Sequence, residues 1–321
     1  MLTRSSVPFV LGCAALGAVS VACSTGENDD GSGGATSSTG TSLTTSSASP
    51  TASASSGTGG GGKTVTIELA SFDVGPGEEV YKCQNFANPF GEDVEVSAFE
   101  SHMTGGSHHL LLFYKNGASD GPLTDCSGLE FDATPYGTQL PDDQLDFPAG
   151  VAAAIPSGTG LRLQSHYLNV TSQTITAHVQ VTFHLAEPGT VTDHAAVLFM
   201  VQPDISVPPM STKTINYDCS VPVDMRVMKA SSHMHKHGTN FHSTVAGQMF
   251  FDTTDWDEPT PKIFDPVREL KAGEPIHFEC TFKNDTPNTL TFGESAATDE
   301  MCILTASFYP APAGLPTITC Q

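Results

Sequence analysis

Hydrophobic and polar residues alternate along several short segments of this chain. The alternation is clearest at residues 65–69 and 175–183, where apolar residues take every second position between Thr, Glu, His or Gln. A period of two places alternate side chains on opposite faces of a β-strand, so these segments predict half-buried strands. Further short apolar runs lie at residues 109–114, 195–201, 276–282 and 302–308. Without a long 3.6-residue period between them, the pattern predicts an all-β fold made of β-sandwiches.

The sequence Glu-Pro-Gly at residues 187–189 predicts a domain boundary, because it contains proline and follows a strong strand pattern. It divides the folded part of the chain into residues 64–187 and residues 188–321. Each segment lies within the usual size range of one domain. We therefore expect two sandwich domains in tandem.

The N-terminal residues have the composition of an export signal followed by a tether. Arg4 precedes an apolar stretch that is shorter than the roughly 20 residues a membrane-spanning helix needs. Residues 1–22 are therefore predicted to be a signal peptide. The sequence Ser-Val-Ala-Cys, which ends at Cys23, resembles a bacterial lipobox, so we expect Cys23 to be lipidated. Residues 23–63 are mainly Ser, Thr, Gly and Ala, which predicts a disordered tether.

These segments predict an exported bacterial protein. With a lipidated Cys23 it would be a membrane-anchored lipoprotein in the periplasm or at the cell surface, and without lipidation it would be secreted. The formal net charge is −22, from 13 Lys and Arg against 35 Asp and Glu, and such a surface repels phosphate backbones. We therefore expect no nucleic-acid partner. We also expect no membrane contact other than the lipid anchor, and a monomer.

Cysteine usage agrees with export. Of the eight cysteines, Cys13 and Cys23 fall in the signal peptide and the anchor, which leaves six in the mature domains. An even number of cysteines outside the cytosol predicts three disulfides, but this count leaves the pairing open.

Three histidines of the first predicted domain are candidate metal ligands. His108 and His109 are adjacent, and adjacent strand residues point to opposite faces, so they can share a metal only at a strand end or an irregularity. The alternative is an ordinary pair with one core and one surface imidazole. His166 would complete a set of three nitrogen ligands, which suits copper or zinc, although a lone strand histidine is more often a polar-face residue.

The second predicted domain carries a further ligand set. His233 and His235 are two positions apart, so on a strand they face the same way and can chelate one ion. His237 continues this parity, and the alternative is therefore a histidine-rich exposed strand. Met301 is by default a core methionine. If it joins the histidine pair, its soft thioether favours Cu(I) and indicates redox copper.

Four segments that carry these residues occur in the order found in one enzyme family. They lie at residues 107–113, 163–167, 233–235 and 299–302. With them, residues 64–321 resemble the copper type II, ascorbate-dependent monooxygenases, which include the peptidylglycine alpha-hydroxylating and dopamine beta-monooxygenases. The resemblance implies two jelly-roll-like β-sandwich domains, each supplying one copper site to an intervening cleft.

The resemblance also implies a role for each ligand. His108, His109 and His166 would hold a copper that supplies electrons, while His233, His235 and Met301 would hold the catalytic copper that binds oxygen. An enzyme of this kind uses two coppers per chain and an external reductant such as ascorbate to hydroxylate a C–H bond of a small-molecule substrate with O₂. The implied disulfides join Cys83 to Cys126, Cys219 to Cys320 and Cys280 to Cys302.

The sequence departs from the peptide-processing relatives at the implied substrate site. Where those relatives hold a carboxylate with Arg, Asn and Tyr, this chain has Ser231, Ile303 and Thr305. Without the Arg a buried carboxylate lacks its charged partner, so we expect a substrate that is not a glycine-extended peptide and is more neutral or apolar. We also expect copper affinity to fall as the pH drops through about 6.5, because only neutral imidazole binds metal.

Two other functions are consistent with parts of this pattern. A tethered copper-binding or copper-shuttling lipoprotein would keep the same ligands without hydroxylating anything, and an exported adhesion module would explain the tether but not the ligands. The remaining histidines are expected to be structural or surface residues: His102, His178, His184, His194, His242 and His277.

Overall fold

The computed structural model describes residues 52–55, 62–130, 132–313 and 315–320. These residues all belong to one compact unit. The predicted signal peptide at 1–22 and the expected lipidation of Cys23 lie outside the described residues, so both remain predictions. Within the predicted tether, β1 (Ala52–Ser55) pairs with β2 (Thr64–Glu68), so this part of the segment contributes a strand rather than disordered chain.

The all-β prediction is confirmed, since the described residues form strands and no α-helix. No helix in this part of the chain is long and apolar enough to cross a bilayer. Residues 175–183 form two strands, β12 (Ile175–Ala177) and β13 (Val179–Leu185), with a break at His178. In β13 the alternation is realised as expected, because Val179, Val181 and Phe183 are buried.

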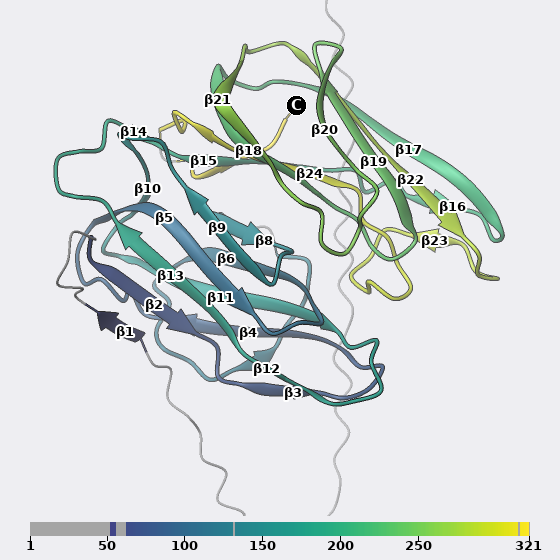
Figure 1. The fold of residues 1–321 in the computed structure, drawn as a ribbon, viewed down its shortest axis with the longest axis horizontal. Coiled ribbons are helices and arrows are strands. Elements are labelled where there is room, and N and C mark those ends of the chain that lie inside the picture. Colours follow the sequence, from purple (N-terminus) through teal and green to yellow (C-terminus); the bar gives the residue numbers. More distant parts are fainter. Residues whose placement is uncertain (1–51, 56–61, 131, 314, 321) are drawn as a thin grey trace, which may run out of the picture. The chain divides into compact units, whose positions relative to one another are not determined.

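The first half of the chain forms two main sheets (Figure 1). One contains β1, β2, β13, β5 (Val94–Met103), β10 (Val151–Ile155) and β14 (Asp193–His194), with β9 (Asp142–Asp146) paired to β5. The other contains β7 (Thr124–Asp125), β4 (Glu79–Phe86), β11 (Thr159–Leu168), β6 (Ser107–Asn116) and β8 (Tyr136–Thr138). A small third sheet pairs β12 with β3 (Phe72–Val74).

The second half of the chain repeats this plan with different strands (Figure 1). One sheet contains β21 (Lys262–Leu270), β18 (Met225–His233), β24 (Ile303–Tyr309), β15 (Ala196–Val201) and β25 (Thr317–Ile318). The other contains β17 (Ser211–Ser220), β22 (Pro275–Asn284), β19 (Gly238–Val245) and β20 (Gln248–Thr253). A short pair joins β16 (Ser206–Val207) to β23 (Leu290–Thr291).

Each half has its own hydrophobic core. In the first, Phe99 and Phe183 from one sheet share a cluster with Leu163 from the other, which is the packing expected of a sandwich. In the second, the cluster joins Leu304 of β24 to Phe278 of β22. The division at residue 187 remains a prediction: β14, which follows it, still pairs with β10 of the first half.

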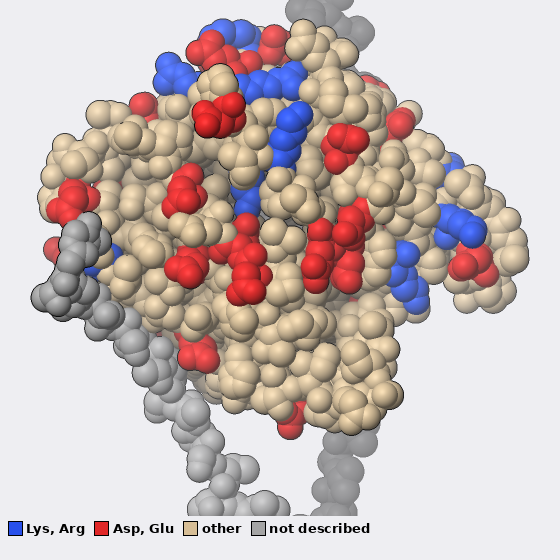
Figure 2. Space-filling model, in the orientation of Figure 1, with Lys and Arg blue, Asp and Glu red and all other residues tan. Residues whose placement is uncertain are grey.

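The described residues contain three disulfides, between Cys83 and Cys126, Cys219 and Cys320, and Cys280 and Cys302. These are the pairs that the family resemblance implied. The first lies in the first half of the chain and the other two in the second half, so each covalent link stays within one core. On the surface, acidic side chains are spread over the face shown in Figure 2, in keeping with the net charge of −22.

Candidate metal centre

His108 and His109 open β6 at an irregularity in the sheet. The register between β6 and β11 pairs His109 with His166 and Ser107 with Tyr167, which leaves His108 as an extra residue, a β-bulge. A bulge lets neighbouring side chains approach the same point, which two adjacent residues on one regular strand cannot do. The ring centroids of His108 and His109 both lie 5.1 Å from that of His166. All three side chains are buried.

His233 and His235 lie at the end of β18. His233 is the last strand residue and His235 follows in irregular chain, yet their ring centroids are only 5.2 Å apart. The ring of His235 is held by a hydrogen bond from Nδ1 to the carbonyl oxygen of Asp299, 3.1 Å away. The expected i, i+2 pair is therefore present, although it is made by a strand end and a hydrogen bond rather than by a continuous strand.

The two histidine sets, which the resemblance assigned to two sites across a cleft, lie against each other in this structure. The ring centroid of His108 is 4.7 Å from that of His233 and 5.3 Å from that of His235. Nitrogens of His108, His109 and His233 all lie within 4.8 Å of one another. The histidines of both sets therefore form one cluster among the described residues, and their division between two coppers stays a prediction.

Hydrogen bonds between the two halves of the chain hold the sets together. Glu79 of β4 accepts hydrogen bonds from Ser295 Oγ at 2.7 Å and from the Ala296 amide at 2.6 Å. The hydroxyl of Tyr81 donates to the carbonyl oxygen of Glu294 at 2.6 Å. These hydrogen bonds connect residues 294–296, which precede Met301, to β4, the neighbour of the strand that carries His166.

Three of the five histidines have one ring nitrogen engaged in a hydrogen bond. His166 Nε2 donates to Glu79 Oε1 at 2.8 Å, and His233 Nδ1 donates to Gln139 Oε1 at 2.9 Å. The Gln139 amide is oriented by its own donation to two backbone carbonyls, those of Trp256 and Asp257. Metal-binding histidines characteristically donate their second ring N–H in this way, which orients the ring and leaves the other nitrogen free.

The remaining ring nitrogens are buried and have no hydrogen-bond partner among the described residues. They are His108 Nδ1 and Nε2, His109 Nδ1 and Nε2, His166 Nδ1, His233 Nε2 and His235 Nε2. A buried polar atom without a partner is costly unless something binds it. Several such nitrogens facing one another fit a transition metal that prefers imidazole, such as copper or zinc.

Burial keeps these imidazoles neutral. It lowers the pKa of His109 to about 3 and that of His235 to about 4, because a charged ring loses its hydration there. The pKa values of His108, His166 and His233 are also lowered well below 6.5 by burial and by the neighbouring histidines. The expected loss of copper near pH 6.5 therefore needs correction, since these ligands remain neutral in more acidic solution.

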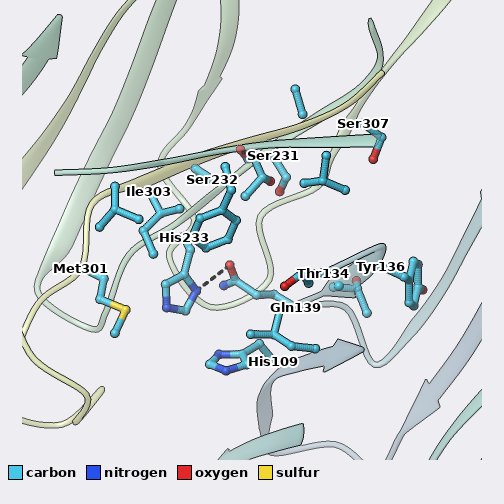
Figure 3. A pocket seen from close by; sticks show the side chains of 18 of the residues that line it. His109, Thr134, Tyr136, Gln139, Ser231, Ser232, His233, Met301, Ile303 and Ser307 are labelled. Carbon is cyan, nitrogen blue, oxygen red and sulfur yellow. Dashed lines mark hydrogen bonds between the residues drawn. The ribbon is translucent and has the colours of Figure 1, made fainter. Parts of the chain in front are cut away.

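Met301 lies beside the cluster. It is buried and lines the same pocket as His109 and His233, and Figure 3 shows its sulfur on the side of the His233 ring. The residue before it, Glu300, accepts hydrogen bonds from the amides of His235 and His237 at 3.2 and 2.9 Å. Burial raises the pKa of Glu300 to about 8. The chain around the methionine is therefore tied directly to the chain that carries the histidines.

Several supporting residues could not be identified from the sequence. Glu79 and Gln139 orient imidazoles, Tyr81 stacks on His166 with ring centroids 3.8 Å apart, and Trp256 lies 5.5 Å from His108. Each comes from a segment far from its partner, and no local pattern marks it. Tyr81 and Glu79 lie on β4 and His166 lies on β11, and the pairing of these two strands brings the three residues together.

The other histidines lie elsewhere. Five of them are close to surface carboxylates: His102 to Asp142, His178 to Glu68, His184 to Glu100, His194 to Glu95 and His277 to Asp218. These positions agree with the surface role expected for them. His237 donates its backbone N–H to Glu300, and its Nδ1 lies 4.0 Å from Asp285 rather than in the cluster.

The fold and the site together define an all-β protein with a cluster of largely buried histidines that could hold a metal ion. Residues 193–321 match the family model described as the copper type II ascorbate-dependent monooxygenase, C-terminal domain. This match includes His233, His235 and Met301 and supports the family that the sequence resembles. Members of this family are copper-dependent oxidoreductases of the monooxygenase type that use ascorbate as the reductant. The match therefore suggests copper-dependent monooxygenase activity in general for this chain.

A structural comparison adds little to this assignment. The crystal structure of the major capsid protein P2 from bacteriophage PM2 aligns with 78% of this chain and 99% of its own, at 10% sequence identity and a TM-score of 0.29. A similarity of this size carries no argument about function.

Proposed function

We propose that the protein is a copper-dependent monooxygenase that uses O₂ to hydroxylate a C–H bond of a small substrate other than a glycine-extended peptide. The observation that carries the proposal is the cluster of five histidines with free, buried nitrogens next to the thioether of Met301. Imidazole suits several metals, but a thioether favours copper and has little use at a zinc or magnesium site. The match of residues 193–321 to the family model supports the same choice.

The net reaction consumes the substrate R–H, O₂, two electrons and two protons, and it yields R–OH and water. Oxidation of one ascorbic acid to dehydroascorbic acid supplies both electrons and both protons. Bound copper would supply one-electron storage and the activation of O₂, so two centres match the two electrons of the reaction. We assign His108, His109 and His166 to the electron-supplying copper and His233, His235 and Met301 to the oxygen-binding copper.

The chain itself supplies orientation and exclusion of water. Glu79 and Gln139 hold the rings of His166 and His233 with their free nitrogens available. Burial of the imidazoles keeps them neutral, which is the form that binds metal. Because four of the five imidazoles are buried, those of His108, His109, His166 and His235, the site is better suited to retaining copper for chemistry than to handing it to another protein.

We also propose that the protein works outside the cytoplasm as a monomer, held at a membrane by a lipid on Cys23. The three disulfides support an oxidising compartment. The acidic composition argues against a nucleic-acid partner. Mass spectrometry of the mature N-terminus would show a diacylglyceryl-modified Cys23 if the anchor exists, and an unmodified N-terminus elsewhere would refute it.

The proposed reaction is tested by oxygen uptake of the copper-loaded protein with ascorbate and candidate substrates. We expect uptake that depends on substrate and is matched by hydroxylated product. Copper that is bound and reduced without product formation for any substrate would favour the copper-shuttling alternative. A protein that retains no copper would refute both.

A further inference from the structure

A pocket opens beside His233 and Met301, and one of its walls is a face of the sheet formed by β18, β24 and β15 (Figure 3). The strand register arranges the residues of this wall in three rows. From the metal end outward the rows are His233, Ile303 and Val201, then Ser231, Thr305 and Phe199, then Lys229, Ser307 and Val197. Four residues of strand separate the first row from the last, which is ~13 Å.

The lining changes in character along these rows. The rest of the lining includes the apolar side chains of Leu111, Leu129, Leu145 and Phe292. It also includes the polar side chains of Glu130, Thr134, Thr138 and Gln139. The first two rows add further apolar surface together with two hydroxyls. The last row brings an ammonium and a hydroxyl into the lining, with the phenol of Tyr136 nearby (Figure 3). The pocket is therefore mainly apolar and has a hydrogen-bonding end away from the metal ligands.

The ammonium group at that end is already paired. Lys229 Nζ lies 2.7 Å from Asp143 Oδ2, and both side chains are only 8% exposed. The same carboxylate oxygen accepts a hydrogen bond from the hydroxyl of Tyr136 at 3.1 Å. Lys229 and Asp143 together carry no net charge, so this end of the pocket is polar but electrically neutral.

A charged ligand would be disfavoured at this neutral end. An anion would have to share Lys229 with Asp143 and would bury an unbalanced negative charge, which is costly where water is excluded. A cation would be repelled by Lys229. The nearby carboxylates are already paired, Asp143 with Lys229, and Glu130, which lines the pocket, with Lys115 and Arg162. An uncharged hydroxyl or carbonyl group can accept a hydrogen bond from Lys229 or Ser307 without adding a charge.

We infer that the substrate is a small, neutral, mainly apolar molecule with a hydroxyl or carbonyl group at one end, and that the Lys229–Asp143 pair selects against charged analogues. This inference rests on the proposed function and names the substrate class of the same site. The cavity volume of about 130 Å³ is close to the ~150 Å³ of an apolar cavity that accepts a benzene ring. The reactive C–H bond would lie at the end near His233 and Met301.

A matched series of ligands tests the inference. The compounds 3-phenylpropan-1-ol, 3-phenylpropanoate and 3-phenylpropylammonium share one ring and one chain length and differ in charge. We expect the metal-free protein at pH 7 to bind the alcohol at least tenfold more tightly than either ion, as measured by titration calorimetry. Because no copper is present, this result is independent of the oxygen-uptake assay that tests the proposed function.

Two variants test the role of the ion pair and of the pocket wall. Asp143→Asn leaves the charge of Lys229 without its partner. The affinity for 3-phenylpropanoate relative to that for 3-phenylpropan-1-ol should therefore rise at least tenfold. The neighbouring Asp142→Asn is the matched control, because Asp142 is exposed and pairs with His102, and it should leave the ratio unchanged. If Asp143→Asn does not fold, Phe199→Trp fills the middle row and should weaken alcohol binding at least tenfold.

Several results would overturn the inference. They are equal or tighter binding of either ion by the wild-type protein, an unchanged ratio in folded Asp143→Asn, and undiminished alcohol binding by Phe199→Trp. Absence of binding for all three compounds would also refute the substrate class. The proposed monooxygenase would then still stand or fall on its own assay.

Discussion

The buried pair of Lys229 and Asp143 gives a quantitative test of the structure. Replacing Lys229 by Met keeps an unbranched side chain of similar length, so the packing of its methylene groups is largely retained. The change leaves the Asp143 carboxylate buried at 8% exposure, with Tyr136 as its remaining hydrogen-bond partner. Removing one partner of a buried pair typically costs about 3–5 kcal/mol. We expect Lys229→Met to lower the free energy of unfolding by about that amount.

The measurement is urea unfolding of the metal-free protein at pH 7 with its disulfides intact, followed by circular dichroism. Lys82→Met is the matched control, because the Lys82–Asp125 pair is exposed at 22% and 84%. Surface pairs contribute about 0–1 kcal/mol. The double variant Lys229→Met with Asp143→Asn removes the stranded charge and should recover much of the loss. The structural reasoning is refuted if Lys229→Met costs no more than Lys82→Met.

Further predictions concern the metal centre. Copper affinity, measured by competition with a chelator, should be nearly constant from pH 7 to pH 5 and should fall only near pH 4 and below. Burial lowers the pKa of His109 to about 3 and of His235 to about 4, so protons compete with the metal only there, and a decline centred on pH 6.5 would contradict the structure. His166→Ala should lose about one of two bound coppers by metal analysis, whereas the exposed His178→Ala should lose none; a single copper in the wild-type protein would argue against the two-centre assignment. Met301→Ile should cost less than about 1.5 kcal/mol of stability, because its volume is similar, yet abolish ascorbate-dependent hydroxylation. Hydroxylation at the wild-type rate would show that Met301 is only a core residue. A glycine-extended peptide should not be turned over, and micromolar-KM turnover of one would show that the pocket has been misread.

The strands could be read from the sequence because alternation is a local property. Val179, Val181 and Phe183 are buried as their spacing predicts, and the chain at 302–308 forms most of β24. The break at His178 was not predictable from the pattern, because the apolar period continues through it. The sequence indicated only that His108 and His109 need a strand end or an irregularity to share a metal. It could not show that a bulge forms there, because the bulge depends on the register with β11.

The candidate ligands were accessible to sequence reasoning because their chemistry lies in the residue types and their order. Their mutual arrangement was not. The family resemblance placed the two histidine sets apart, whereas the ring centroids of His108 and His233 lie 4.7 Å from each other. Contacts such as those from Glu79 to Ser295 and Ala296 decide this, and they join residues more than 200 positions apart in the chain.

By itself, the sequence determined the all-β class, the set of possible copper ligands and the absence of the arginine that peptide-processing relatives use. Each follows from residue identity or from a period of two, which needs no knowledge of distant neighbours. The tertiary structure alone decided that the histidines form one cluster and that Glu79 and Gln139 orient them. It also decided that the charge of Lys229 is neutralised. The neutralisation of Lys229 depends on Asp143, which is 86 residues away in the chain. Such pairs form only when strand register and sheet packing bring distant segments together, and no local pattern encodes which segments will meet.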